Sequence, residues 1–168
     1  MPLSYTFLDT PIGQLLLAGE GEVLHFLGFP EGKMAIDPKP EWCRDDAILQ
    51  QAKRQLNEYF AGQRQNFDLQ LAPVGTEFQL QVWQQLQHIP YGRVCSYSDL
   101  AVAIARPKAV RAVGAANGQN PIPVIIPCHR VIGANGQLTG FGGGLDTKQH
   151  LLKLEGIEVD GERQIALF

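Results

Sequence analysis

The segment that most restricts how this chain can fold is residues 122–129, an apolar run with two prolines that ends in Pro127-Cys128-His129. Each proline fixes φ at about −65° and removes a backbone donor, so the chain is stiff where Cys128 is presented. A thiol acts as a nucleophile only as thiolate, and an adjacent base or cation can lower its pKa from about 8.5 to about 3.5–7.5. Most free cysteines are small buried hydrophobes, and that interpretation of Cys128 stays open here.

The length of 168 residues allows one domain or two small ones, with enough chain to bury a core. The N-terminus has no basic region followed by a long apolar stretch, so we expect neither secretion nor membrane insertion. The three cysteines, Cys43, Cys95 and Cys128, form no CxxC pair. Such sparse use fits the reducing cytoplasm and argues against a disulfide framework or a cysteine-rich zinc site. We expect a cytoplasmic monomer.

Basic residues are concentrated in one part of the chain. The net charge is −3, yet residues 93–153 carry seven Lys and Arg against two Asp, a net charge of +5. Residues 1–92 carry six basic residues against eleven acidic ones, and residues 154–168 carry one against four. The basic part contains Pro127-Cys128-His129. A local excess of this kind is typical of a protein that contacts a polyanion, although a solvated basic face would look the same.

The first part of the chain reads as a small sheet with one helix. Apolar runs bounded by Gly and Pro predict short strands around residues 5–7, 15–17, 23–27 and 67–71. A Pro- and Gly-rich loop covers residues 29–40. Apolar residues at helical spacing predict a helix over residues 45–61, stopped by Gly62. Pro73-Val74-Gly75 then places the domain boundary, which gives domains 1–73 and 74–168.

The second part reads as mainly helical. A helix is predicted to begin at Thr76, whose hydroxyl forms a capping box with Gln79. A short helix capped by Ser96 or Ser98 runs to residue 105, and another covers residues 108–117. A helix, a tight turn and a second helix are the outline of a helix-turn-helix. A last helix runs from residue 146 or 147 to 154, and Gly156 caps it.

The second helix of this pair carries almost no large side chains. Val110 and Val113 suit the core, which leaves four residues for the outside: Ala109, Arg111, Ala112 and Ala116. Alanine-rich helices are often only good helix formers. A nearly bare helix can also enter the minor groove of DNA, which is about 6 Å wide, and one arginine on it can fill the gap left by an extruded nucleotide.

These residues lie within a longer string, from Arg111 to Gly133, that reads RAVGAANGQNPIPVIIPCHRVIG. The string closely resembles the O6-alkylguanine-DNA alkyltransferases, or methylated-DNA–protein-cysteine methyltransferases. The resemblance covers residues 74–158, where Arg111, Asn120, Cys128 and Glu155 match in spacing without a gap, and it extends loosely over the N-terminal portion. It implies an α+β fold, with a ribonuclease-H-like N-terminal domain followed by a mainly helical domain with the helix-turn-helix and the Pro-Cys-His-Arg segment.

The resemblance implies direct reversal of DNA damage by a single-use enzyme, with a role for each of five residues. Cys128 takes the alkyl group from guanine O6 by in-line displacement, His129 acts as base through a water, and Glu155 orients the imidazole. Asn120 bridges the helix-turn-helix to the active-site strand. Tyr97 donates a proton or hydrogen bond to the leaving guanine. No later step releases the alkyl group, so each molecule reacts once.

Contacts with DNA and with the flipped base also follow from the resemblance. Arg111 is the intercalating finger, and the residues facing the minor groove with it are Lys108, Ala109, Ala112 and Ala116. The base pocket is formed by Tyr97, Val131, Phe141 and Gly142, with the backbone carbonyls of Cys128 and Val131 and the Gly142 amide reading the base edge. Arg130 is expected to pair with a carboxylate, and Asn117 to cap or turn the chain.

The expected partner is double-stranded DNA carrying O6-alkylguanine or O4-alkylthymine, with no cofactor. Phe141 stands where tyrosine is frequent in the family, and Gly142 where some relatives carry serine. Because these two residues are smaller than their counterparts, we expect the base pocket to have room for alkyl groups larger than methyl. Some relatives hold zinc in the N-terminal domain, but His25 and Cys43 are too few ligands for a four-coordinate site, so we predict no metal.

Three other functions compete with this one. A non-catalytic alkylated-DNA-binding protein would have lost its nucleophile, usually to tryptophan, whereas Cys128 is present. A cysteine hydrolase would need an oxyanion hole, and only the glycine-rich residues 140–144 offer a candidate. A transcription regulator is compatible with a helix-turn-helix, but the bare second helix carries little that could read bases in the major groove.

Overall fold

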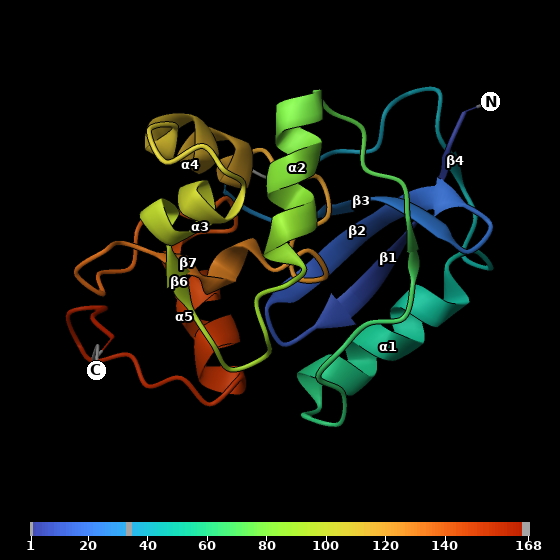
Figure 1. The fold of residues 1–168 in the computed structure, drawn as a ribbon. Helices are drawn as coiled ribbons and strands as arrows, with labels where there is room; N and C mark the ends of the chain where they lie inside the picture. The colour runs from blue at the N-terminus through green and yellow to red at the C-terminus, as the bar shows by residue number, and fades with distance from the viewer. Residues whose placement is uncertain (1, 33–34, 166–168) are drawn as a thin grey trace.

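A computed structural model describes residues 2–32 and 35–165 of the chain. It places an N-terminal sheet with helix α1 beside a group of four further helices (Figure 1). The sequence predicts three strands here, and β1 (Ser4–Thr10), β2 (Gly13–Glu20) and β3 (Val23–Gly28) form an antiparallel meander. Two short strands pair in parallel at its edges, β4 (Cys43–Arg44) with β1 and β5 (Gln70–Leu71) with β3. The strand predicted over residues 67–71 is therefore limited to its last two residues.

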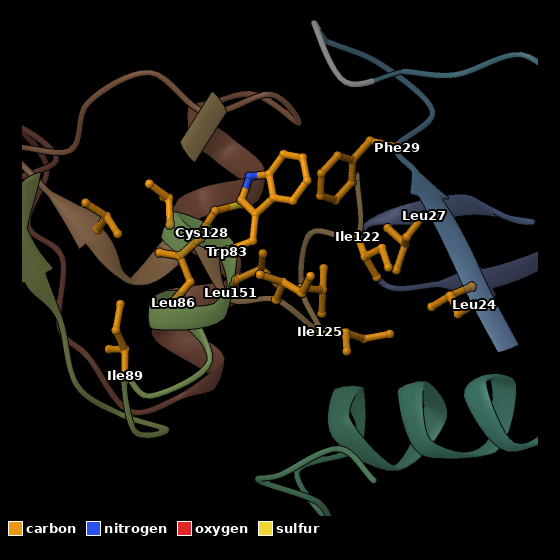
Figure 2. Close-up of a cluster of buried hydrophobic side chains, with 14 of the residues drawn as sticks. Leu24, Leu27, Phe29, Trp83, Leu86, Ile89, Ile122, Ile125, Cys128 and Leu151 are labelled. Atoms are coloured by element: carbon orange, nitrogen blue, oxygen red, sulfur yellow. The ribbon is translucent and has the colours of Figure 1, made fainter. Parts of the chain in front are cut away.

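Strand β2 is buried on both faces because its apolar run is continuous. Side chains alternate between the two faces of a strand, so Leu15 and Leu17 point to the main core, whereas Leu16 and Ala18 point to a smaller cluster that contains Trp42. The main core continues beyond the sheet into the helical part of the molecule. Figure 2 shows Leu24 and Leu27 of β3 in the same buried cluster as side chains of the helical part, such as Trp83 and Leu86.

Helix α1 (Gln50–Phe60) begins five residues later than the sequence predicts. Leu49 adopts a left-handed conformation with φ of 56°, which ends helical geometry at that point although its side chain is fully buried. The carboxylate of Glu22 accepts hydrogen bonds from the first two helical amides, those of Gln50 and Gln51. This cap comes from a distant strand connection, so local periodicity could not reveal the start of the helix.

The helix-turn-helix is present and is held by the predicted caps. Helix α2 (Glu77–Leu86) begins with the Thr76–Gln79 capping box, and Ser96 forms a second box with Asp99 at the start of α3 (Tyr97–Ala103). Helix α4 (Val110–Gly118) follows α3 after a turn that contains Pro107. Helices α2, α3 and α4 pack on one another, and the indole of Trp83 in α2 donates to the Ala116 carbonyl of α4.

The segment with Cys128 lies between α4 and the last helix. Residues 122–127 form buried turns instead of the strand that the resemblance implies, and Val124 is left-handed with φ of 74°. Cys128–Arg130 is one 3₁₀ turn, after which β7 (Val131–Ile132) pairs in parallel with β6 (Cys95–Ser96). Helix α5 (Leu145–Leu154) then leads into Glu155, and Gly156 has the positive φ expected of the residue after a helix. No helix of the described residues is long and apolar enough to cross a bilayer.

Candidate active site

Cys128 opens the 3₁₀ turn directly after Pro127, and its side chain is buried. Burial raises the pKa of the thiol to about 11, although a hydrogen bond from the Asn120 amide and the charge of Lys148 act in the opposite direction. The thiol is therefore protonated at neutral pH. A nearby base is needed to produce the thiolate at the moment of reaction.

The side chains of His129 and Glu155 form a fully buried pair. His129 Nε2 lies 2.6 Å from Glu155 Oε2, and neither side chain is exposed. Because a carboxylate only accepts hydrogen bonds, Nε2 carries the proton in this contact and Nδ1 has the free lone pair. Nδ1 is itself buried and has no hydrogen-bond partner among the described residues. Burial lowers the pKa of His129, although the adjacent Glu155 acts in the opposite direction. The lowered pKa favours the neutral imidazole, which can accept a proton.

Five donors converge on the carboxylate of Glu155. Arg130 donates twice, from Nε to Oε1 at 2.8 Å and from Nη2 to Oε2 at 3.1 Å, and the Gly92 amide donates to Oε1 at 3.1 Å. His129 and Tyr59 donate to Oε2, each at 2.6 Å. Burial alone would raise the pKa of Glu155, but the bonds from His129 and Arg130 outweigh it and lower the pKa to about 2. The expectation that Arg130 pairs with a carboxylate is confirmed.

Asn120 connects the end of α4 to the turn before Cys128. Its Nδ2 donates to the Ile126 carbonyl at 2.7 Å, and its Oδ1 accepts from the Ile122 amide at 3.0 Å. Asn117, which we expected only to cap or turn the chain, is buried and lies 3.5 Å from the Cys128 carbonyl through its Nδ2. Both amides tie the helix-turn-helix to the turn that contains Cys128, called the nucleophile turn below.

Lys148 is a buried cation at this site that the sequence interpretation missed. It is fully buried, and its Nζ donates to the Val131 carbonyl at 2.6 Å and to the Thr139 carbonyl at 3.4 Å. It lies in the first turn of α5, where the helix dipole disfavours a positive charge. Burial lowers the pKa of Lys148 to about 8, and Cys128 opposes this shift. An ammonium in this position can stabilise a thiolate on Cys128. Its helical spacing to Leu145 and Leu151, both apolar, is the signal that could have found it.

Tyr97 is the first residue of α3. Its hydroxyl is 2.5 Å from Thr139 Oγ1, and burial raises its pKa, so it stays protonated. The glycine-rich loop packs against the N-terminal part of the molecule: the ring of Phe141 lies 5.5 Å from that of Phe29. Gly142 is buried, and a Cβ on Gly32 would come within 2.2 Å of its carbonyl oxygen. The N-terminal part of the molecule therefore contacts the loop that carries Phe141 and Gly142, two residues of the predicted base pocket.

The exposed surface of α4 differs from the predicted one at one residue. Arg111 and Ala112 are exposed, as is Lys108 in the turn before the helix, and Ala109 is half-buried. Ala116 is buried at 2% exposure, so its predicted place at the DNA surface is wrong. It shares a face with Val113 because residues three apart in a helix point the same way. The exposed residue in that turn is Ala115.

The described residues contain no group of three or more His, Cys, Asp and Glu side chains arranged to hold a metal ion. Cys128, His129, Glu155 and Asn120 are brought together by the hydrogen bonds above. Arg111 lies instead on the outer surface of the helix-turn-helix.

Two family models match this chain. The model described as the DNA binding domain of 6-O-methylguanine DNA methyltransferase matches residues 77–157, and the one described as its ribonuclease-like domain matches residues 3–73. The methylated-DNA–protein-cysteine methyltransferase of Methanosarcina acetivorans is 52% identical over 90% of this chain and 97% of its own length. That of Mycobacterium tuberculosis is 49% identical, over 91% of this chain and 92% of the relative. The predicted ribonuclease-like and DNA-binding parts are confirmed.

Solved structures agree with these matches. The crystal structure of Mycobacterium tuberculosis OGT in complex with DNA superposes with a TM-score of 0.86 at 49% identity, covering 90% of this chain and 92% of that one. The structure of S. pombe Atl1 in complex with damaged DNA containing O6-carboxymethylguanine has a TM-score of 0.50 at 30% identity, covering 54% of this chain and 90% of that one.

Proposed function

This chain belongs to the 6-O-methylguanine DNA methyltransferase family, and from that premise we propose that Cys128 is the residue that accepts the alkyl group. The activity of the family is DNA repair by direct reversal, with transfer of the alkyl group to a cysteine of the protein. The observation that carries the assignment is the position of Cys128 beside the buried His129–Glu155 pair. Cys43 is exposed in β4 and Cys95 is half-buried in β6, so neither lies in the turn that carries His129.

His129 is the base in this proposal. The thiol proton of Cys128 passes to a bridging water, and a proton of that water passes to Nδ1, the imidazole nitrogen with the free lone pair. The imidazolium that forms is stabilised by Glu155, which the Arg130 guanidinium keeps ionised. Lys148 stabilises the negative charge on the sulfur.

Displacement follows on the flipped base. The sulfur of Cys128 forms a bond to the alkyl carbon while the bond from that carbon to guanine O6 breaks, and its electron pair goes to the purine. The Tyr97 hydroxyl donates to the leaving base, with Thr139 as its partner in the free protein. The thioether is not reversed by any group of the site. Asn120 and Asn117 keep the nucleophile turn fixed to the helix-turn-helix.

The substrates are double-stranded DNA with O6-alkylguanine or O4-alkylthymine, and the pocket accepts alkyl groups larger than methyl. Gly142 supports the last point, since it adds no side chain to the wall of the pocket. The test is incubation of the protein with duplexes containing O6-methylguanine, O6-benzylguanine or O4-methylthymine. We expect transfer from each to stop at one alkyl group per protein molecule. Continued turnover would contradict the acceptor role, and failure of one duplex alone would contradict only the substrate range.

Arg111 is proposed to enter the duplex and occupy the space of the flipped nucleotide, supported by its exposure on a surface of α4 that carries only small side chains. We expect Arg111→Ala to slow transfer from duplex DNA by about tenfold or more, because flipping costs a few kcal/mol. Transfer from free O6-benzylguanine should change by less than about twofold, since a free base needs no flipping. Single-turnover kinetics measure both, with the exposed Arg54→Ala as the matched control. Equal slowing of both substrates would contradict the role.

We also propose the domain division at residues 73 and 74, supported by the limits of the two family models at residues 73 and 77. We propose in addition that the protein is a monomer and that it acts in the cytoplasm. The free cysteines Cys43, Cys95 and Cys128 support a reducing compartment.

A further inference from the structure

Tyr59 connects the N-terminal domain to the centre of the active site. It lies near the end of α1, is fully buried, and donates its hydroxyl proton to Glu155 Oε2 at 2.6 Å. The two residues are 96 positions apart in the chain. The same oxygen accepts from His129 Nε2 at 2.6 Å and from Arg130 Nη2 at 3.1 Å. One carboxylate oxygen is thus shared between the base of the reaction and a residue of the other domain.

The position of the Tyr59 hydroxyl is fixed by the packing of its ring. Three aromatic rings surround it, with centroids 5.3 Å away for Phe60, 5.4 Å for Phe67 and 6.2 Å for Tyr91. Burial and the adjacent Glu155 raise the pKa of Tyr59, so it remains a protonated donor at any working pH. A rigid ring with a permanent donor can hold a carboxylate oxygen in one place.

We propose that Tyr59 is a positioning residue for alkyl transfer, which holds Glu155 Oε2 against His129 and limits the negative charge that this oxygen offers to the imidazole. The proposal rests on the function assigned to His129 above. It gives the N-terminal domain a direct part in the reaction, beyond its contribution to the common core.

The electrostatic effect has a definite sign. Hydrogen bonds to an ionised carboxylate stabilise its charge and reduce its basicity. Removing the Tyr59 hydroxyl leaves Oε2 with two donors, so it interacts more strongly with the imidazolium of His129, and the pKa of His129 rises. The other charged or titratable groups around the pair are Arg130 on the same turn, Lys148 from α5 and Tyr91 from the loop after α2. None of these is altered by the change.

The variant Tyr59→Phe tests the proposal because it keeps the packed ring and removes only the hydroxyl. We expect the acid limb of the pH–rate profile for transfer from O6-methylguanine duplex to move up by about half a pH unit. The rate constant on that limb then falls about threefold, and the rate constant on the plateau changes less. Tyr91→Phe is the matched control: it removes the hydroxyl that donates to the Leu154 carbonyl at 3.1 Å, beside the same cluster. Its acid limb should coincide with that of the unaltered protein.

A second readout does not depend on repair activity. Imidazole nitrogen NMR follows the protonation of His129 in the protein without DNA, and we expect a higher midpoint in Tyr59→Phe than in the unaltered protein or in Tyr91→Phe. Coincident curves, including curves that show no titration in any of the three, would overturn the positioning role. Failure of the unaltered protein to take up a methyl group would instead overturn the function of the site, whatever the NMR result.

Discussion

Replacing Cys128 by serine should abolish methyl transfer from O6-methylguanine duplex while leaving affinity for DNA within about twofold. A serine hydroxyl at this position would have to lose a proton that His129 cannot remove to a useful extent, since an alkoxide is far less accessible than a thiolate. We therefore expect the rate constant of transfer to fall by roughly 10³-fold or more. Binding should persist because the exposed Arg111 and Lys108 lie on the helix-turn-helix and not at the buried sulfur.

Cys95→Ser and Cys43→Ser are the controls for this variant. Cys95 is half-buried in β6, next to the strand that follows the nucleophile turn, and Cys43 is exposed in β4. Both variants should transfer a methyl group at about the rate of the unaltered protein. Measurable transfer by Cys128→Ser, with a methyl group found on the protein, would show that another residue is the acceptor. A protein that only recognises alkylated DNA would behave alike in all three variants.

The second large effect is expected at Glu155, where Glu155→Gln should impair both stability and activity. The change leaves the buried Arg130 guanidinium without its counter-charge, and breaking a buried ion pair costs about 3–5 kcal/mol of the free energy of unfolding. It also removes the carboxylate that, in the proposed mechanism, orients His129 and stabilises the imidazolium. We expect transfer to slow by about 10²-fold or more. Chemical denaturation and single-turnover kinetics at neutral pH measure the two effects.

The stability effect at Glu155 should depend on pH with a definite sign. The pKa of Glu155 is lowered in the folded protein from 4.5 to about 2, so its stabilising contribution is complete above pH 4.5 and is lost as the pH falls toward 2. The difference in unfolding free energy between the unaltered protein and Glu155→Gln should shrink over this range. Glu158→Gln makes the same chemical change at an exposed position nearby and should show no such dependence. A constant difference across the range would contradict the account.

The sequence predicted the parts of the structure that depend on neighbouring residues. The strands of the meander, the capping box at Thr76 and a cap at Ser96 are confirmed, because alternation and capping are local properties. The start of α1 was placed wrongly, because the Glu22 carboxylate that caps it comes from another part of the chain. The turns before Cys128 were also missed: a buried Val124 in a left-handed conformation is not an expected state of a β-branched residue.

The candidate site shows the same division. Cys128, His129 and Asn120 are close in sequence, and their spacing carried the resemblance to a known family. The sequence indicated no functional role for Tyr59 or Lys148. A tyrosine near the end of an amphipathic helix and a lysine near the start of another are common in proteins of any function. Their importance comes from contacts across the fold, with Glu155 for the tyrosine and with Val131 for the lysine.

Ala116 shows how a small error in helical phase changes a functional interpretation. The alanines of α4 are alike in sequence, and only packing decides which of them face outward. Trp83 donates to the Ala116 carbonyl, which places that turn of α4 against the core. The side chains of α4 that are exposed, and that we propose face a groove of DNA, are therefore those of Arg111, Ala112 and Ala115.

The most direct test of the acceptor role is peptide mapping after the protein has reacted with duplex DNA containing O6-methylguanine. Mass spectrometry of the digested protein should find one added methyl group, on the peptide with Cys128, and unmodified Cys43 and Cys95. The modified fraction should equal the fraction of repaired guanine. A methyl group on any other residue, or repair without a modified Cys128, would contradict the account.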